Sequence, residues 1–329
     1  MRSFAKINLG LKIGPTRADG FHELRTIYQT IALHDVVRAE VQPGSGIEIR
    51  CNDPRVPLDE SNTCYQAAER VLKAAKASAK VIVQIEKRLP VQGGMGAGSS
   101  NAIATMLGLE RALDAKISAG DKMRVAAEIG SDVPLFLIGG TVLGVGHGEE
   151  VYPLPDLPVM QLVVVTPPIA VSTPKAFAQW DDLVAREDEL TGAGATGTIN
   201  KFSQAVEAWL RESVFSQAVS ASEPASGVPA VGGDRAETPL LDLVRAGIEN
   251  DFECVVFPEY PDLREVKRVL EREGARYASL SGSGSTVYGL FPSGKEAQAA
   301  AARMCASGHA AVATTTLTRE EYWKEVARG

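Results

Sequence analysis

The chain has 329 residues, of which 45% are hydrophobic and 6% are aromatic. That length and apolar content suffice for two globular domains, each with its own core. The formal net charge of -7 argues against a nucleic-acid or anionic-membrane surface. A phosphate ligand would therefore be held by local backbone amides and one or two placed cations.

The four cysteines are widely spaced and form no C-x-x-C pair. They predict reduced thiols with neither a disulfide nor a metal role, as in a cytoplasmic protein. A strand begins by Phe4, which leaves no room for a signal peptide, and no apolar run approaches the ~20 residues of a membrane span. We expect a soluble cytoplasmic protein.

Alternating apolar residues from Ile7 to Ile13 predict a first strand with one buried face. Lys6 and Asn8 then share the opposite face. Further strands are predicted at 36–41, 47–51 and 81–86. Amphipathic spacing predicts helices at 61–78, 100–113 and 121–129, the last of them ended by Gly130.

Three prolines between residues 153 and 158 indicate a linker, which divides the chain into domains of residues 1–155 and 156–329. After the linker we expect strands at 162–165, up to 280, at 286–291 and at 311–317, and helices after Thr173, at 261–274 and at 295–305. That order is typical of an α+β domain with helices on one face of an antiparallel sheet. Residues 220–239 are rich in Gly, Pro and Ser and predict a flexible insertion near 215–240.

Residues 90–100, here called the glycine loop, place four glycines and two serines directly before a helical segment. Glycines let backbone N–H groups approach an anion, and the free amides and dipole of a helix start favour its negative charge. The spacing fits neither a P-loop nor the dinucleotide fingerprint, and an ordinary glycine-rich turn is the alternative. We predict a nucleotide cradle made of Pro90, Val91, Gln92, Gly93, Gly94, Met95, Gly96, Ala97, Gly98, Ser99 and Ser100.

Three more motifs accompany the glycine loop: Ala5-Lys6-Ile7-Asn8-Leu9, Gly130-Ser131-Asp132-Val133-Pro134 and Ser281-Gly282-Ser283-Gly284-Ser285. The ordered set resembles the GHMP kinases, the family of galactokinase, homoserine kinase and mevalonate kinase, from Phe4 to about Phe291. The resemblance implies a two-domain α+β fold, with an N-terminal domain like ribosomal protein S5 domain 2 and a C-terminal ferredoxin-like α/β sandwich. It also implies ATP as phosphoryl donor, with Mg²⁺ bound mainly through substrate phosphates.

In this resemblance the catalytic residues are Lys6 and Asp132. Asp132 would accept the proton of the attacking hydroxyl, while Lys6 would orient that carboxylate and neutralise developing negative charge. A charged residue within an alternating apolar strand needs a partner or a ligand, which supports Lys6. Either Ser99 or Ser100 could help to hold the metal ion or the β-phosphate. The turn at 281–285 is expected beside the glycine loop, and a tight hairpin without ligand contact is the alternative.

Two segments, Arg17-Ala18-Asp19-Gly20-Phe21-His22 and Thr173-Pro174-Lys175-Ala176-Phe177, resemble one particular member of the family. That member phosphorylates the 2-hydroxyl of a cytidine diphosphate-linked alcohol in the non-mevalonate isoprenoid pathway. By resemblance, Phe21 and Phe177 would sandwich the cytosine ring. His22 would contact the polar edge of the base, and Asn8 and Thr173 would complete the substrate site. Core packing is the alternative for each Phe, and a solvent-facing amide is the alternative for Asn8.

Two other functions stay open: a kinase of the mevalonate or homoserine type, and a non-catalytic nucleotide-binding module. The two phenylalanines argue against the first, and the presence of both Lys6 and Asp132 argues against the second. Gln92, Met95 and Ala97 depart from the family's loop pattern without removing a required charge or amide. We expect a small-molecule cytidine diphosphate substrate and neither a nucleic-acid nor a membrane partner. The sequence leaves the oligomeric state undetermined.

Overall fold

The structure is a computed structural model that describes residues 1–191, 202–204, 206–207 and 249–328. Its strands are β1 (Arg2–Thr16), β2 (His22–Gln42), β3 (Gly46–Cys51), β4 (Lys80–Glu86), β5 (Thr141–Val145), β6 (Glu150–Pro153), β7 (Gln161–Val165), β8 (Tyr277–Leu280), β9 (Val287–Phe291) and β10 (Ala311–Thr315). Its helices are α1 (Thr63–Ala75), α2 (Ala97–Ala112), α3 (Ala119–Ile129), the 3-10 helix η1 (Pro134–Leu137), α4 (Thr173–Thr191), α7 (Glu253–Glu259), α8 (Pro261–Arg272), α9 (Gly294–Ala306) and α10 (Arg319–Arg328). The predicted insertion near 215–240 lies outside the described residues.

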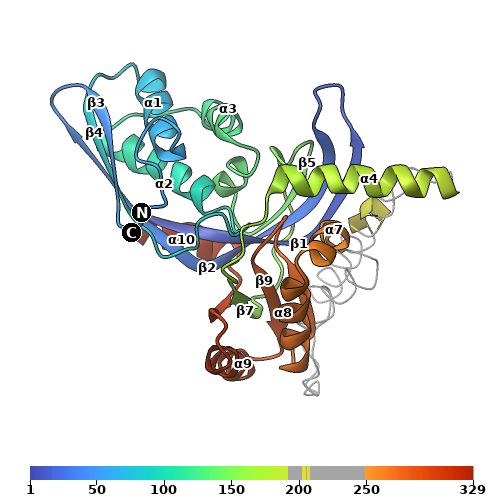
Figure 1. The fold of residues 1–329 in the computed structure, drawn as a ribbon. Helices are drawn as coiled ribbons and strands as arrows, with labels where there is room; N and C mark the ends of the chain where they lie inside the picture. The colour runs from blue at the N-terminus through green and yellow to red at the C-terminus, as the bar shows by residue number, and fades with distance from the viewer. Residues whose placement is uncertain (192–201, 205, 208–248, 329) are drawn as a thin grey trace, which may run out of the picture.

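The first sheet is built around the long strand β2, which pairs with β1, β4 and β5. All pairs in this sheet are antiparallel except β3 with β4. Helices α1, α2 and α3 cover one face of the sheet (Figure 1). A hydrophobic core fills the space between them, with Val71, Ile103 and Leu109 from the helices and Val81 and Val83 from β4.

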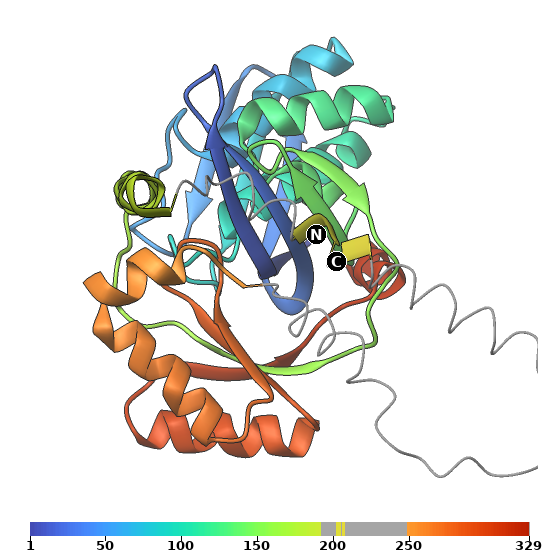
Figure 2. The same ribbon diagram turned by 90° about the vertical axis from the view of Figure 1, so that its right-hand side faces the viewer.

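The second sheet has the strand order β10-β7-β9-β8 and is antiparallel throughout. Alternate residues of β7 enter different cores: Val163 and Val165 join the core under α8 and α9, whereas Leu162 and Val164 pack against residues of β1 such as Ile7. The second sheet therefore lies between its own helices and the first sheet (Figure 2). This is why β7 reads as a continuous apolar run.

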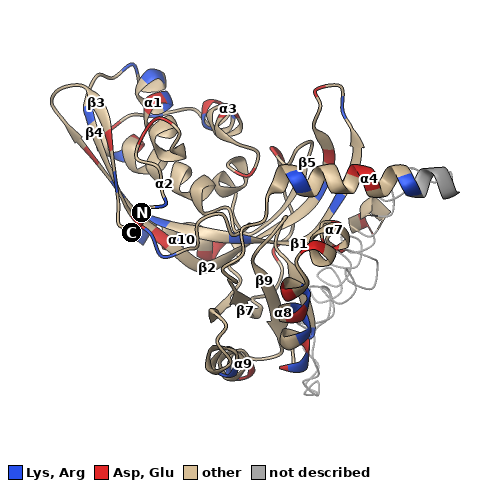
Figure 3. Ribbon diagram, viewed as in Figure 1, with Lys and Arg blue, Asp and Glu red and all other residues tan. Residues whose placement is uncertain are grey.

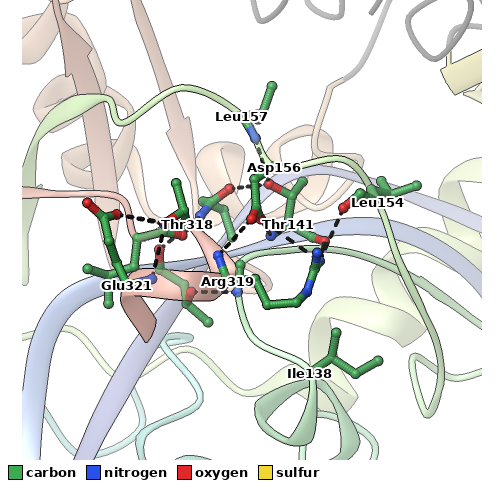
Figure 4. Close-up of polar contacts among 12 residues, drawn as sticks. Ile138, Thr141, Leu154, Asp156, Leu157, Thr318, Arg319 and Glu321 are labelled. Atoms are coloured by element: carbon green, nitrogen blue, oxygen red, sulfur yellow. Dashed lines mark hydrogen bonds and ion pairs between the residues drawn. The ribbon is translucent and has the colours of Figure 1, made fainter. Parts of the chain in front are cut away.

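The C-terminal helix α10 returns to the first sheet, and the two ends of the described chain lie side by side, where Arg2 pairs with Glu325 (Figures 1 and 2). Thr318 and Glu321 form a capping box at the helix start, with the Glu321 N–H donating to Thr318 Oγ1 at 3.2 Å and the Thr318 N–H donating to Glu321 Oε2 at 3.0 Å. Arg319 donates to the carbonyls of Thr141 and Leu154 (Figure 4). The helix thereby fixes the connection that follows β6.

Most of the expected elements are present, and the antiparallel second sheet is confirmed. The expectation of one buried face on the first strand is wrong, because Lys6, Asn8 and Lys12 are as buried as the apolar residues between them. The chain also forms elements that the sequence pattern did not predict, namely the first half of β2 together with β5, β6, η1, α7 and α10. The division at residue 155 stays a prediction; β6 ends at Pro153 and β7 begins at Gln161 in the other sheet.

Charged residues of both signs alternate along α8 and α4 (Figure 3). Within the described part of the chain, no helix combines the length and the apolar character needed to cross a membrane.

Candidate active site

The glycine loop connects β4 to α2, and its end forms the start of that helix. Gly96 is the N-cap residue, with φ of +64°, and no side chain caps the helix. The first amides of α2 are therefore free of a side-chain acceptor, which is the arrangement that suits an anion. The loop lines a cavity of about 380 Å³ together with residues that include Thr63 and Lys87.

Two neighbouring segments hold the glycine loop in place. The Lys6 N–H of β1 donates to the Met95 carbonyl at 3.0 Å. From the turn at 281–285, Ser281 Oγ donates to the Gly94 carbonyl at 3.0 Å, and the following Thr286 N–H donates to the Gly93 carbonyl at 3.2 Å. The turn therefore packs against the glycine loop, as expected from the sequence.

A buried lysine and a carboxylate meet beside this loop. Lys6 Nζ lies 3.2 Å from Asp132 Oδ2, although the two residues are far apart in the sequence. Lys6 Nζ also donates to Asn8 Oδ1 at 2.7 Å, and Asn8 Nδ2 donates to Thr26 Oγ1 at 2.7 Å. The side chain of Lys6 is 3% exposed and that of Asp132 is 34% exposed, so the pair joins the protein interior to an open space.

Tyr28 of β2 holds the other oxygen of the carboxylate. Its hydroxyl donates to Asp132 Oδ1 at 2.9 Å, and Lys6 Nζ lies 5.3 Å from the centre of its ring. Burial, and secondarily the charge of Asp132, raises the pKa of Tyr28 well above its ordinary value. The phenol therefore keeps its proton and continues to donate to Asp132. Both carboxylate oxygens are thus oriented, one by Lys6 and one by Tyr28.

The pair opens into a second cavity of about 530 Å³, which includes Lys6, Asn8, Tyr28 and Asp132 in its lining. Gly94 lines both this cavity and the cavity along the glycine loop. The two spaces therefore adjoin at the loop. A molecule in one cavity could meet a molecule in the other beside Lys6.

The aromatic residues singled out in the sequence line the far part of the second cavity. Phe21 lies at the tip of the β1–β2 hairpin, is 58% exposed and packs on the ring of His147. The ring of Phe177, from α4, stacks on His22 at 4.9 Å with an interplanar angle of 9°. Thr173 Oγ1 lies 2.7 Å from Ser283 Oγ, and both residues line the same cavity. Each phenylalanine thus faces the cavity while resting on a histidine.

The two serines at the start of α2 have different surroundings. Ser99 lines the cavity along the glycine loop. Ser100 is buried, its hydroxyl accepts from Ser3 Oγ at 2.8 Å, and its N–H donates to the Gly96 carbonyl at 2.9 Å. Of the two, only Ser99 lines the cavity, and the choice between Ser99 and Ser100 as the serine that contacts the nucleotide stays a prediction.

Sequence reasoning missed three residues that bring polar side chains to the second cavity, namely Tyr28, His147 and Asp181. Asp181 Oδ1 lies 2.7 Å from His22 Nε2. Tyr28 and His147 belong to segments in which the sequence predicts neither a strand nor a turn. No hydrophobic period therefore indicated which way their side chains point. Among the described residues, no group of three or more His, Cys, Asp or Glu is arranged to hold a metal ion.

Comparisons with known proteins agree with this geometry. Residues 62–140 match the family model of the GHMP kinases N terminal domain, and residues 237–310 match that of the GHMP kinases C terminal. The chain belongs to the GHMP kinase family, and the predicted α+β fold and phosphotransferase class are confirmed.

Within that family, several relatives that are at least 30% identical to this chain carry the same enzyme name. The 4-diphosphocytidyl-2-C-methyl-D-erythritol kinase of Solibacter usitatus is 36% identical over 292 residues, which cover 88% of this chain and 80% of the relative. The enzyme of the same name from Moorella thermoacetica is 32% identical over 315 residues, with coverages of 96% and 98%.

Solved structures give the same grouping. A crystal structure of 4-(cytidine 5'-diphospho)-2C-methyl-D-erythritol kinase matches with a TM-score of 0.70 and 29% identity, covering 96% of this chain and 98% of that one. The mevalonate kinase of L. major matches with a TM-score of 0.65 at 16% identity, covering 96% and 95% of the two chains. The latter likeness supports the fold alone.

Proposed function

We propose that this protein transfers the γ-phosphoryl group of ATP to the 2-hydroxyl of 4-diphosphocytidyl-2-C-methyl-D-erythritol, in non-mevalonate isoprenoid precursor biosynthesis. One observation carries the proposal. The Lys6–Asp132 pair, with its 3.2 Å contact, lies in the lining of the second cavity, here called the acceptor cavity because we assign the phosphoryl acceptor to it. That cavity meets the glycine loop at Gly94. Phosphoryl transfer needs this kind of juxtaposition more than it needs covalent chemistry from the protein.

In the proposed reaction the acceptor oxygen attacks the γ-phosphorus of ATP. A new O–P bond forms, the bond from the γ-phosphorus to the bridging oxygen breaks, and ADP leaves with that oxygen. The hydroxyl proton passes to a free lone pair of the Asp132 carboxylate. Lys6 and Tyr28 contact the two oxygens of that carboxylate at 3.2 and 2.9 Å. The carboxylate of Asp132 is therefore already oriented before the reaction begins.

Lys6 has a second role in this mechanism. Its ammonium group carries the positive charge at the junction of the two cavities, where negative charge develops on the transferred oxygens. Asn8 holds this ammonium through a 2.7 Å hydrogen bond. Because its Oδ1 accepts from Lys6 and its Nδ2 donates to Thr26, we assign Asn8 mainly to positioning Lys6 and only secondarily to binding the substrate hydroxyls.

The donor side of the site fits a nucleotide held by backbone. The uncapped start of α2 and residues Val91 to Ser99 supply backbone N–H groups for the triphosphate, while Pro90, which has no N–H, only lines the cavity. Mg²⁺ bound to ATP would screen the phosphate charges, and the hydroxyl of Ser99 is the side chain that we assign to it.

The cytidine end of the acceptor is assigned to the rings in the second cavity. Phe21 and Phe177 offer flat faces for the base, and His22, held by Asp181, offers polar backbone groups beside them. A mevalonate or homoserine kinase has no base to stack and would have no use for these rings. A non-catalytic nucleotide-binding protein would have no use for Asp132 beside Lys6.

A panel of acceptors tests the substrate. The purified protein should release ADP from ATP with 4-diphosphocytidyl-2-C-methyl-D-erythritol, and not with mevalonate or homoserine. Turnover of mevalonate or homoserine at a comparable kcat/KM would reject the cytidylyl assignment. No turnover with any acceptor, with ATP binding intact, would favour the binding module.

Asp132→Asn tests the proton acceptor, because it removes one negative charge at nearly constant shape. We expect turnover to fall at least a hundredfold while the Kd for an ATP analogue changes less than threefold. Asp262→Asn is the matched control, since Asp262 lies exposed in the first turn of α8. Wild-type turnover in Asp132→Asn would remove Asp132 from its proposed role.

We place the reaction in the cytoplasm, where ATP is supplied. The four free cysteines fit such a reducing compartment.

A further inference from the structure

The turn between β5 and β6 contributes to the acceptor cavity although no sequence motif pointed to it. The turn is tied to β2, because the Leu24 N–H donates to the Gly146 carbonyl at 2.6 Å. It is also closed on itself, since the His147 N–H donates to Glu149 Oε2 at 2.6 Å. These hydrogen bonds hold the backbone of His147 in place, so its side chain lines the cavity from a fixed position.

The imidazole of His147 packs under the exposed ring of Phe21. The two ring centres are 4.7 Å apart and the planes are inclined by 30°. Both ring nitrogens face carboxylates, with Nε2 3.3 Å from Asp19 Oδ2 and Nδ1 3.3 Å from Glu149 Oε2. His147 is therefore held from two sides while it supports one face of Phe21.

Asp19 links the same histidine to the backbone of Phe21. Its Oδ1 accepts from the Phe21 N–H at 3.0 Å, and its Oδ2 faces His147. The hydrogen bond from the Phe21 N–H is the main cause that lowers the pKa of Asp19. The tip of the β1–β2 hairpin is thus fastened to the β5–β6 turn through both the side chain and the backbone of Phe21.

The position of the turn is further limited by Gly148. Its φ is +104°, and a Cβ at this position would lie 2.4 Å from the Tyr28 hydroxyl. The turn therefore packs directly on the phenol that donates to Asp132. His147, which lies on this turn and supports Phe21, is therefore held at a fixed distance from Asp132.

We propose that His147 is a positioning residue for recognition of the acceptor's aromatic base: it holds the ring of Phe21 in place, so that one face of Phe21 stays available for stacking. This inference rests on the proposed function. An aromatic side chain at a hairpin tip loses rotamer freedom on binding unless it is already ordered, and a pre-ordered ring makes binding tighter.

Two substitutions separate the ring of His147 from its hydrogen bonds. His147→Ala removes both, and we expect it to raise the acceptor KM roughly three- to tenfold, the range of a lost aromatic pair. His147→Phe retains an aromatic face under Phe21 and should recover at least half of that loss. His309→Ala, near the end of α9, is the control for loss of a histidine outside the cavity.

The readouts are the acceptor KM, the ATP KM and kcat, together with the Kd for CDP measured by calorimetry. We expect the acceptor KM and the CDP Kd to rise together in His147→Ala, by more than kcat falls, with the ATP KM unchanged. An unchanged CDP Kd, or an equal rise in both KM values, would overturn the positioning role. The CDP measurement needs no turnover, so a wild-type protein that fails to phosphorylate the acceptor would reject the proposed function without deciding the role of His147.

Discussion

A methyl group at Gly94 would test whether the contact between the glycine loop and the turn at 281–285 sustains nucleotide binding. Gly94 has a φ of +75°, and an added Cβ would lie 2.2 Å from the Ser281 carbonyl oxygen and 3.0 Å from that of Gly284. Both neighbours are backbone atoms of a buried turn, so neither can move aside without displacing the turn. Gly94→Ala must therefore shift the loop, the turn or both.

The cost has two parts. An L-residue in the left-handed region costs roughly 1–2 kcal/mol, and forcing an atom into a packed interior costs about 1–3 kcal/mol more. Gly308→Ala is a control that isolates the first part, because Gly308 has a φ of +89° and a Cβ there would meet nothing within 4 Å. We expect a destabilisation of about 2–5 kcal/mol for Gly94→Ala and about 1–2 kcal/mol for Gly308→Ala.

Thermal unfolding and steady-state kinetics measure the two consequences. Gly94→Ala should lower Tm more than Gly308→Ala does and should raise the ATP KM at least tenfold, because the amides on either side of residue 94 move. Gly308→Ala should leave the ATP KM at the wild-type value. If the two variants had the same Tm, or if Gly94→Ala kept the wild-type ATP KM, the steric argument for the loop would be refuted.

Three further predictions use other parts of the site. Tyr28→Phe removes the 2.9 Å hydrogen bond to Asp132 and should lower kcat roughly tenfold or more at an unchanged ATP KM, and a wild-type kcat would contradict the orienting role. Phe177→Leu keeps an apolar side chain without a flat face, so the acceptor KM should rise several-fold more than the ATP KM; equal rises would count against stacking. Burial raises the pKa of Tyr277 to about 12, so the folded state favours the neutral phenol. The contribution of Tyr277 to the free energy of unfolding is complete below pH 10, and about 3 kcal/mol of it is lost as the pH rises from 10 to about 12. Denaturant unfolding between pH 9 and 11 should show this decline in the free energy of unfolding, and the decline should be less steep in Tyr277→Phe.

The sequence predicted the regular elements where a hydrophobic period coincides with a clear boundary. Helix α3 is an example at its C-terminal end, where Gly130 follows the last residue as expected, whereas its start lies two residues before the predicted Asp121, at Ala119 after the Ser118 cap. The period failed on β1, where Lys6 and Asn8 suggested an exposed face. That face is covered by segments more than a hundred residues away, such as the one that carries Asp132, and no local pattern encodes such a cover.

The same limit applies to the site. The glycine loop, Lys6 and Asp132 stand in motifs that the family resemblance could find; the resemblance implied that Lys6 and Asp132 meet, and the structure gives the contact as 3.2 Å. Tyr28 and His147 stand in no motif, because a phenol and an imidazole acquire their roles only through what lies across the sheet or the turn. Ser100 also stands in the glycine loop, and its burial beside Ser3 is a feature that the motif does not encode.

The direction of the proposed catalytic groups is set by packing on the other side of β1. Ala5, Ile7 and Leu9 are buried in the core that joins the two sheets, which leaves Lys6 and Asn8 pointing the opposite way. Two tyrosines of the second sheet fasten the same strand, because the Tyr288 hydroxyl donates to the Asn8 carbonyl at 2.8 Å and the Tyr277 hydroxyl donates to the Leu9 carbonyl at 3.2 Å.

The register between β1 and β2 then brings Tyr28 to the same face, since Tyr28 is the cross-strand partner of Asn8. A slip of one residue would move Lys6 into the apolar core and place Ile7 beside Asp132. The slip would bury a charge without a partner and set apolar side chains against the polar groups of the site, so the hydrophobic contact between the sheets selects the register that holds the ammonium 3.2 Å from the carboxylate. Stability of the fold and alignment of the proposed reacting groups therefore depend on the same strand register.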